Sequence, residues 1–232
     1  MSKIKIPQPD ELTNYEELIF KSIKEILNKN IVFYIDSEIV DYCRQKIKLS
    51  EFQVYKTLYS LIHRKLLVPG STLTKDHVLE NENRAIIFNQ IKEKPGIHIR
   101  ELCSIINKSS GVVRAHLKVL ENFEFIRRKT YSNPKLTLLF TSDYPDIYDD
   151  FFVVTKNEND QRIIQLLIND LLTISELSTQ LGVHHSTIQY HLEKLEALDL
   201  VLHIKLDENT TKYIFNKTRL DAFMTFLETN VA

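Results

Sequence analysis

Glycine, cysteine and tryptophan are scarce in this chain, and the low glycine and cysteine contents restrict the folds and binding sites that it can have. Its 232 residues include four glycines, two cysteines and no tryptophan. So little glycine argues against a phosphate-cradling loop and against a nucleotide-binding α/β sheet, because both need glycine where the backbone approaches phosphate. The plentiful aliphatic residues beside Lys, Glu and Asn favour a mostly helical protein.

The two cysteines, Cys43 and Cys103, fall within predicted helices, and neither belongs to a CxxC pair. We therefore expect buried free thiols in a reducing compartment, not a disulfide or a metal site. The sequence has no run of about 18 consecutive apolar residues, and no signal-peptide pattern opens it. These features predict a cytoplasmic protein without a membrane segment.

Charge is distributed unevenly along a chain whose formal net charge is −1. Residues 81–140 carry 11 Lys and Arg against 5 Asp and Glu, a net charge of +6. Residues 141–160 carry 1 basic and 6 acidic residues, and residues 161–232 carry 6 and 9. A phosphate backbone responds to the local field, so any nucleic-acid contact is expected to centre on residues 81–140.

Residues 95–129 set the pattern for the rest of the chain. A helix with apolar residues at helical spacing is followed by residues 109–111 (Ser-Ser-Gly), a turn whose serines can cap the next helix. That second helix ends before a basic strand starting at Phe125, which turns at residues 132–134 and returns as another strand. Helix, turn, helix and two-stranded ribbon form the outline of a winged helix-turn-helix.

This pattern recurs along the sequence. It repeats with a constant shift of 75 positions, so that Ile99 matches Ile174, and more weakly with a shift of 59, so that Ser50 matches Ser109. Such a repeat predicts a mainly α protein with short β-hairpins, built as three tandem winged helix-turn-helix modules. The predicted parts are a flexible arm (1–13), a first module (14–80), a second module (81–140), an acidic-aromatic linker (141–159) and a third module with a C-terminal helix (160–232).

Several local features are also predicted. Asn14 and Ser50 are the expected helix caps in the first module, and residues 66–68 an expected strand. In the second module Ile86 is expected to face the core. For the linker we favour a connector that packs its aromatic side chains between modules over a segment that docks a partner.

Two stretches carry a resemblance to a known family. HIRELCSIINKSSGVVRAHLKVLENFEFIRR and ISELSTQLGVHHSTIQYHLEKLEALDLV resemble the ArsR/MarR-like winged-helix transcriptional regulators of archaea and bacteria. The resemblance covers residues 80–216 well and residues 14–80 loosely. It implies that the second helix of each pair lies in the major groove of DNA and that the ribbon touches the flanking backbone or minor groove.

Exposed residues on those elements, most of them polar or basic, are the candidate DNA contacts. In the second module they are Ser109, Ser110, Val112, Arg114 and Lys118 on the helix and Arg127, Arg128 and Lys129 on the ribbon. In the third module they are His184, His185, Ser186, Thr187, Gln189 and Tyr190, with Lys194 on the same expected surface.

The histidines do not make a convincing metal site. His116 and His191 occupy matching positions in two modules, which indicates a structural role in which the ring bonds backbone. A metal site needs three or four convergent ligands, and His184 and His185 are adjacent, so their side chains diverge. No nucleophile elbow, HExxH motif or phosphate loop is present, so we predict no enzyme, no metal and no cofactor.

The sequence thus predicts a sequence-selective regulator of transcription that binds double-stranded DNA through the second module and, as an open question, the third. A homodimer would double the site, although three modules in one chain provide the same advantage. The first module, with Glu51 and Phe52 at its helix start, favours packing or pairing. The alternative is a scaffold that binds no DNA, similar to the winged-helix subunits of the ESCRT-II complex or of polymerase-associated factors.

Overall fold

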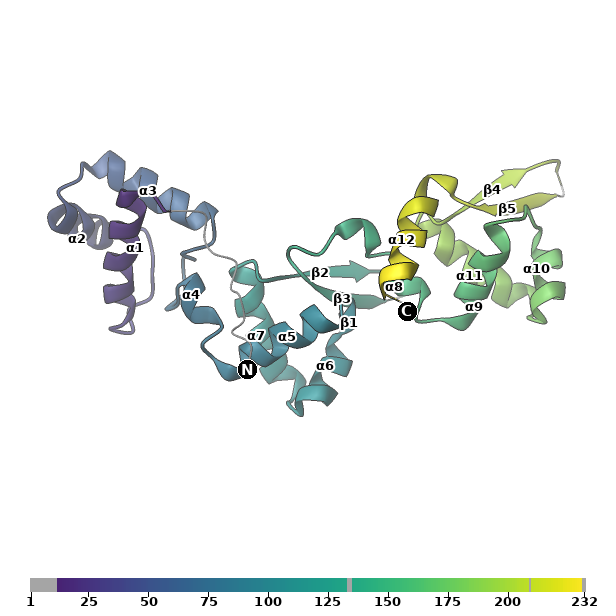
Figure 1. Cartoon of the computed structure of the whole chain (residues 1–232), viewed down its shortest axis with the longest axis horizontal. Helices are drawn as coiled ribbons and strands as arrows, with labels where there is room; N and C mark the ends of the chain where they lie inside the picture. The colour runs from purple at the N-terminus through teal and green to yellow at the C-terminus, as the bar shows by residue number, and fades with distance from the viewer. Residues whose placement is uncertain (1–11, 133–134, 209, 231–232) are drawn as a thin grey trace. The chain divides into compact units, whose positions relative to one another are not determined.

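The computed structural model describes residues 12–132, 135–208 and 210–230. Most of the predicted arm at residues 1–13 therefore lies outside the described residues. The chain forms two compact units (Figure 1). The first contains residues 1–128 and 139–142, and the second contains residues 129–138 and 143–232. Helices dominate both units, and the strands are short, as the sequence predicts.

The first unit begins with three helices, α1 (Asn14–Leu27), α2 (Ser37–Ile47) and α3 (Glu51–His63). Thr13, and not Asn14, caps α1: its hydroxyl accepts from the Glu16 N–H, and the Glu16 carboxylate accepts from the Thr13 N–H. Ser50 caps α3 in the same reciprocal way with Gln53, as predicted. Both caps satisfy backbone N–H groups that the first helical turn leaves free.

The three helices enclose a core that includes Ile19, Ile23, Val54 and Leu58. No two-stranded wing follows them among the described residues. The strand predicted at 66–68 is wrong: only an isolated bridge joins Leu67 to Thr74, before the short helix α4 (Lys75–Val78). Pro69-Gly70 interrupts the segment, because proline lacks an N–H for a ladder. That residues 14–80 form a winged module therefore stays a prediction.

The second module is built from three helices and a three-stranded sheet. Its elements are α5 (Glu82–Glu93), β1 (Ile97–His98), α6 (Ile99–Ile106), α7 (Ser110–Asn122), β2 (Ile126–Tyr131) and β3 (Leu136–Thr141). The strand order is β1-β3-β2, so β2 is an edge strand. The strand β1 has only two residues, too few to produce a recognisable alternation of apolar and polar residues in the sequence.

Val113, Leu117 and Leu120 of α7 are fully buried, as their spacing predicts, and pack with Ile87 and Ile91 of α5. The prediction for Ile86 is wrong, because its side chain is 41% exposed. Phe88 takes the core position instead and meets Phe125 edge-to-face at 5.7 Å. On a helix of 3.6 residues per turn, Ile87, Phe88 and Ile91 share a face from which Ile86 is turned away.

The linker is part of the second unit's core. It contains the 3₁₀ turn η1 (Asp146–Tyr148) and the short helix α8 (Phe151–Val154). Phe151 and Phe152 pack against the last helix, α12 (Leu220–Asn230), with ring centroids 5.1 Å from Phe223 and 4.8 Å from Phe226, respectively. Phe151 is 0% exposed and Phe152 9%. The aromatic residues of the linker thus complete the core of the second unit.

The third module repeats the second with its own ribbon. Its elements are α9 (Glu158–Leu167), α10 (Ile174–Leu181), α11 (His185–Ala197), β4 (Val201–Lys205) and β5 (Thr211–Phe215), then the turn η2 (Lys217–Arg219) and α12. Gly182 ends α10 with φ +66°, a left-handed conformation that glycine adopts without strain. The core positions of α7 are matched in α11 by Ile188, Leu192 and Leu195, all buried.

Candidate nucleic-acid interface

The turn between α6 and α7 fixes where α7 begins. Asn107 ends α6 in the left-handed conformation with φ 50°. Two residues later Ser109 caps α7 by accepting from the Val112 N–H at 3.5 Å. With Val113, Leu117 and Leu120 turned inward, the predicted contacts Ser109, Ser110, Val112, Arg114 and Lys118 are all exposed. They form the outer face and N-terminal end of α7.

Arg114 and Lys118 lie one turn apart on that face. The Arg114 Nε donates to the Ser110 hydroxyl at 3.1 Å, which orients the guanidinium along the start of the helix. The first turn of α7 contains no acidic residue. The partial positive charge of a helix N-terminus and two basic side chains therefore act in the same direction on an approaching phosphate.

The basic residues on β2 contact other side chains of the chain, so they are less available to phosphate than the sequence suggests. Both Arg128 nitrogens on one edge of the guanidinium donate to the Glu121 carboxylate of α7. This hydrogen-bonded pair, with its ionic attraction, raises the pKa of Arg128. Arg127 is half-buried, with its guanidinium carbon 4.7 Å from the centre of the Phe140 ring. Lys129 is exposed, and its ammonium lies 5.8 Å from the centre of the Tyr131 ring.

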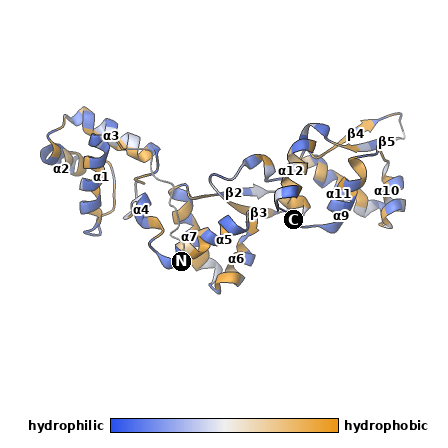
Figure 2. Ribbon diagram, viewed as in Figure 1, coloured by the Kyte–Doolittle hydropathy of each residue, from blue (hydrophilic) through white to orange (hydrophobic). Residues whose placement is uncertain are grey.

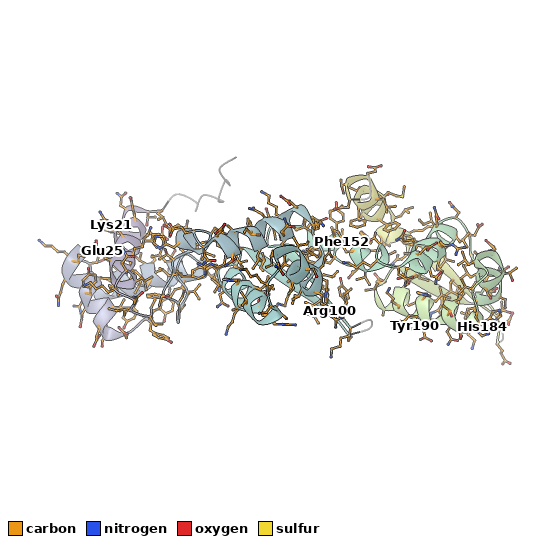
Figure 3. All side chains as sticks on the ribbon, turned by 90° about the horizontal axis from the view of Figure 1, so that it is seen from below. Lys21, Glu25, Arg100, Phe152, His184 and Tyr190 are labelled. Carbon is orange, nitrogen blue, oxygen red and sulfur yellow. The ribbon has the colours of Figure 1, made fainter. Side chains whose placement is uncertain are left out.

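In the third module, α11 begins at His185. His184 is its cap: the ring Nδ1 accepts from the Ser186 N–H at 3.3 Å. His184, His185, Ser186, Gln189 and Tyr190 are exposed, and Thr187 is half-buried. Figure 3 shows the labelled side chains of His184 and Tyr190 along the same side of this unit. The Gln189 amide donates to Glu193 at 3.0 Å.

Lys194 was expected on that surface, and this prediction is wrong. Its side chain is 6% exposed, and its ammonium donates to the Asp160 carboxylate, which is fully buried. The other Asp160 oxygen lies 2.7 Å from Nδ1 of His191, so His191 bonds a carboxylate and not the expected backbone group. Asp160, His191 and Lys194, which we call the buried triad, join α9 to α11.

The sequence holds a signal for the buried triad that periodicity does not reveal. The caps Asn81 and Asn157 align α5 with α9 at a shift of 76, so the matching positions of the second module are Arg84, His116 and Val119. Asp160 and Lys194 are thus present together in one copy of the repeat and absent together from the other. Burial, with nearby Arg84 and Lys108, lowers the pKa of His116.

Among the described residues, no group of three or more His, Cys, Asp or Glu side chains is placed to hold a metal ion. No helix in the described part of the chain is both long and apolar enough to cross a bilayer. Cys43 is buried and Cys103 partly so, and both are free. Burial raises the pKa of the Cys43 thiol to about 11.

Family models match the two segments whose geometry is described above. Residues 81–127 match the model for a winged helix-turn-helix DNA-binding domain, and residues 157–204 match a helix-turn-helix domain. The chain therefore contains two helix-turn-helix domains with the winged fold. In the structure the helix pair of each segment is followed by a two-stranded ribbon, β2–β3 or β4–β5, which extends beyond the matched residues and is the wing.

A curated relative has the same kind of domain. An uncharacterised HTH-type transcriptional regulator of Methanocaldococcus jannaschii is 30% identical over 148 residues, which is 64% of this chain. This chain spans only 37% of that relative's length.

Two solved structures are also similar to parts of this chain. NolR from Sinorhizobium fredii is 23% identical with a TM-score of 0.32, over 38% of this chain and 87% of NolR. An ArsR-like transcriptional regulator from Rhodococcus sp. RHA1 is 25% identical with a TM-score of 0.32, over 36% of this chain and 75% of its own.

Proposed function

We propose that this chain is a transcriptional regulator that binds double-stranded DNA in a sequence-selective way, with α7 as its main contact. The observation that carries the proposal is the outer face of α7. It combines exposed hydroxyl groups, two exposed basic residues and an acid-free first turn, within a segment of net charge +6. The family matches and the relative's printed description support the same function.

On this proposal α7 lies in the major groove, where Ser109, Ser110 and Arg114 meet base edges or phosphates. Val112, which is 42% exposed, offers an apolar contact for a thymine methyl group. Lys118 and Lys129 contact phosphate, and Arg127 does so from its place beside Phe140. Arg128 reaches phosphate only when it leaves Glu121.

The third module is proposed as a second reader of bases. Its first turn also lacks an acidic residue, and Gln189 has the amide that pairs with adenine in two hydrogen bonds. His184, His185, Ser186, Thr187 and Tyr190 supply further donors and acceptors. Residues 161–232 are acidic overall, so this module adds selectivity more than affinity.

The test is the salt dependence of binding. After selection of a target from random duplexes, fluorescence anisotropy gives the dissociation constant at several salt concentrations. We expect Arg114→Ala with Lys118→Ala to weaken binding and to reduce the salt slope by about two, one for each lost phosphate contact. The control removes two exposed lysines of the first module, Lys21→Ala with Lys29→Ala. An unchanged slope in the α7 variant contradicts the assignment of this face.

One observation favours a second candidate, a scaffold that binds proteins. The α3 helix of the first module, which aligns with α7, starts with Glu51 and exposes Phe52 (75%) and Tyr59 (62%). An acidic first turn repels phosphate, and exposed aromatic residues are typical of protein contacts. If the selection yields no duplex that binds more tightly than random DNA, the scaffold replaces the regulator.

A further inference from the structure

The ribbon of the third module has one edge without a partner. Leu206 donates its N–H to the Thr210 carbonyl at 2.9 Å, and Asn216 donates to the Leu200 carbonyl at 2.9 Å. In an antiparallel pair the hydrogen-bonded positions alternate, so the even-numbered residues of β4 bond β5. The N–H and C=O groups of Val201, His203 and Lys205 therefore point away from β5. No backbone group in the described part of the chain meets them.

The other edge of the ribbon is protected. Leu172 and Tyr213 exchange backbone hydrogen bonds of 3.0 and 2.7 Å, which occupy the middle of the outer side of β5. The asymmetry leaves β4 as the strand that is ready to pair. Figure 1 shows the ribbon β4–β5, and much of β4 is orange, that is hydrophobic, in Figure 2.

The side chains of β4 do not discourage pairing. Natural edge strands avoid association by placing charges, above all lysine, on the edge. The edge strand β2 follows this rule with the exposed Arg128 and Lys129. On β4, by contrast, one face carries Leu202 (45% exposed) and Ile204 (44%), and Leu206 (55%) continues the alternation.

Acidic side chains beside the opposite face of β4 favour contact with a basic side chain from a partner strand. A shallow groove runs along the open edge and includes Glu196 and Asp199 from the end of α11. Glu196 lies 2.6 Å from Nδ1 of His203, and the Asp199 carboxylate has no ion pair among the described residues. Lys205, two positions along the strand, is exposed and likewise unpaired in the described structure.

We propose that β4 pairs antiparallel with β4 of a second copy of this chain, about a two-fold axis at Ile204. In this register His203 and Lys205 of the second copy exchange backbone hydrogen bonds. Leu202 stands opposite Leu206 of the second copy, and the two Ile204 side chains face each other. The second copy's Lys205 then lies beside His203, where Glu196 and Asp199 neutralise it.

A second copy fits this edge because the pattern is self-complementary. The sequence Leu202-His203-Ile204-Lys205-Leu206 alternates symmetrically about its centre. A two-fold axis therefore satisfies every apolar and ionic contact twice, as an isologous interface requires. The result is a continuous four-stranded sheet without an open edge at its centre.

The first test measures self-association of the full chain by sedimentation equilibrium without DNA, so it does not depend on the proposed function. We expect a dimer in the micromolar range. Ile204→Lys places two ammonium groups face to face and should weaken the dimer about tenfold or more. Ile105→Lys, at a similarly exposed isoleucine of α6 (42%), is the control and should leave the dimer intact. A monomeric wild type, or a dimer that Ile204→Lys does not weaken, overturns the proposal.

The second test fixes the register. Residues that face each other without mutual hydrogen bonds have Cα atoms about 4.5 Å apart, which lies within disulfide range. Under mild oxidation Ile204→Cys should form a covalent dimer, whereas two copies of Leu202→Cys, four positions out of register, should not. The wild type controls for Cys43 and Cys103. Equal cross-linking of both variants, or of neither, contradicts an axis at Ile204.

Discussion

The second and third modules share a fold but differ in where their charges lie. The second has basic residues on an exposed helix face and on its edge strand, and His116 lies near Arg84, with no carboxylate among the described groups that shift its pKa. The third has an apolar edge strand and a cation and a carboxylate buried beside His191. The apolar positions that hold the two folds together match, whereas the charged positions do not. The comparison indicates that the repeated apolar positions specify the shared fold, whereas the charged positions, which are not repeated, determine how the two modules differ in their surfaces and contacts.

The largest expected effect concerns the buried triad. Asp160→Ala leaves the Lys194 ammonium buried without a partner, and breaking a buried ion pair costs about 3–5 kcal/mol. We expect the free energy of unfolding of the second unit to fall by about this amount. Urea denaturation monitored by circular dichroism measures the change.

The comparison with the second module supplies the control. Asp160→Ala combined with Lys194→Val, which places at position 194 the residue type of the matching Val119, removes both charges together. This variant should recover most of the stability. If it is as unstable as Asp160→Ala alone, the ion pair is not what stabilises the junction of α9 and α11.

A second prediction distinguishes base recognition by the third module from phosphate binding by the second. Gln189→Ala should reduce discrimination between target and mutated duplexes by about 1–3 kcal/mol at one base position and leave the salt slope unchanged. Arg114→Ala should reduce the slope by about one. Binding of both variants to a panel of single-base mutants at several salt concentrations distinguishes them, and identical profiles would remove the contrast between the modules.

A third prediction concerns the paired arginine on β2. Glu121→Gln removes the carboxylate that holds Arg128 and frees its guanidinium for phosphate. Duplex binding should become tighter, with a salt slope steeper by about one. Glu124→Gln, at an exposed acidic residue nearby in the sequence, is the control for the change in net charge. Equal effects of the two variants would mean that Arg128 was already free.

The smallest effect is a pH dependence at His116. Burial lowers its pKa from the ordinary value of 6.5, so the unfolded chain binds more protons in this range. Its contribution to stability is complete above pH 6.5 and decreases as the pH falls toward the lowered pKa. The stability of the wild type should therefore fall relative to His116→Gln below that pH. A constant difference between the two proteins across the range contradicts this account.

The sequence predicts what depends on neighbours along the chain. Ser109 as a cap and the inward face of α7 follow from local spacing, and each is confirmed. The fold class follows because the same spacing recurs. At the candidate site, the exposed α7 residues follow from which positions the core occupies.

What the sequence does not predict depends on distant partners. Lys194 meets Asp160 across 34 positions, and Arg128 meets Glu121 from a strand onto a helix. Helical spacing cannot distinguish a solvated lysine from one that a carboxylate has drawn inside. The same limit applies to Arg127, whose position depends on Phe140 in the neighbouring strand.

The division of the chain at β2 and β3 affects how the protein can be cut into pieces. Residues 129–138 belong to the second unit, so the chain passes from one unit to the other at 128, 138 and 142. Tyr131, which is 8% exposed, donates its hydroxyl to Asp150 at 3.0 Å. A fragment that ends at Ser142 keeps Tyr131 but loses that acceptor and the residues around it. The second module is therefore not an excisable fragment, and its wing must be studied with the rest of the chain attached.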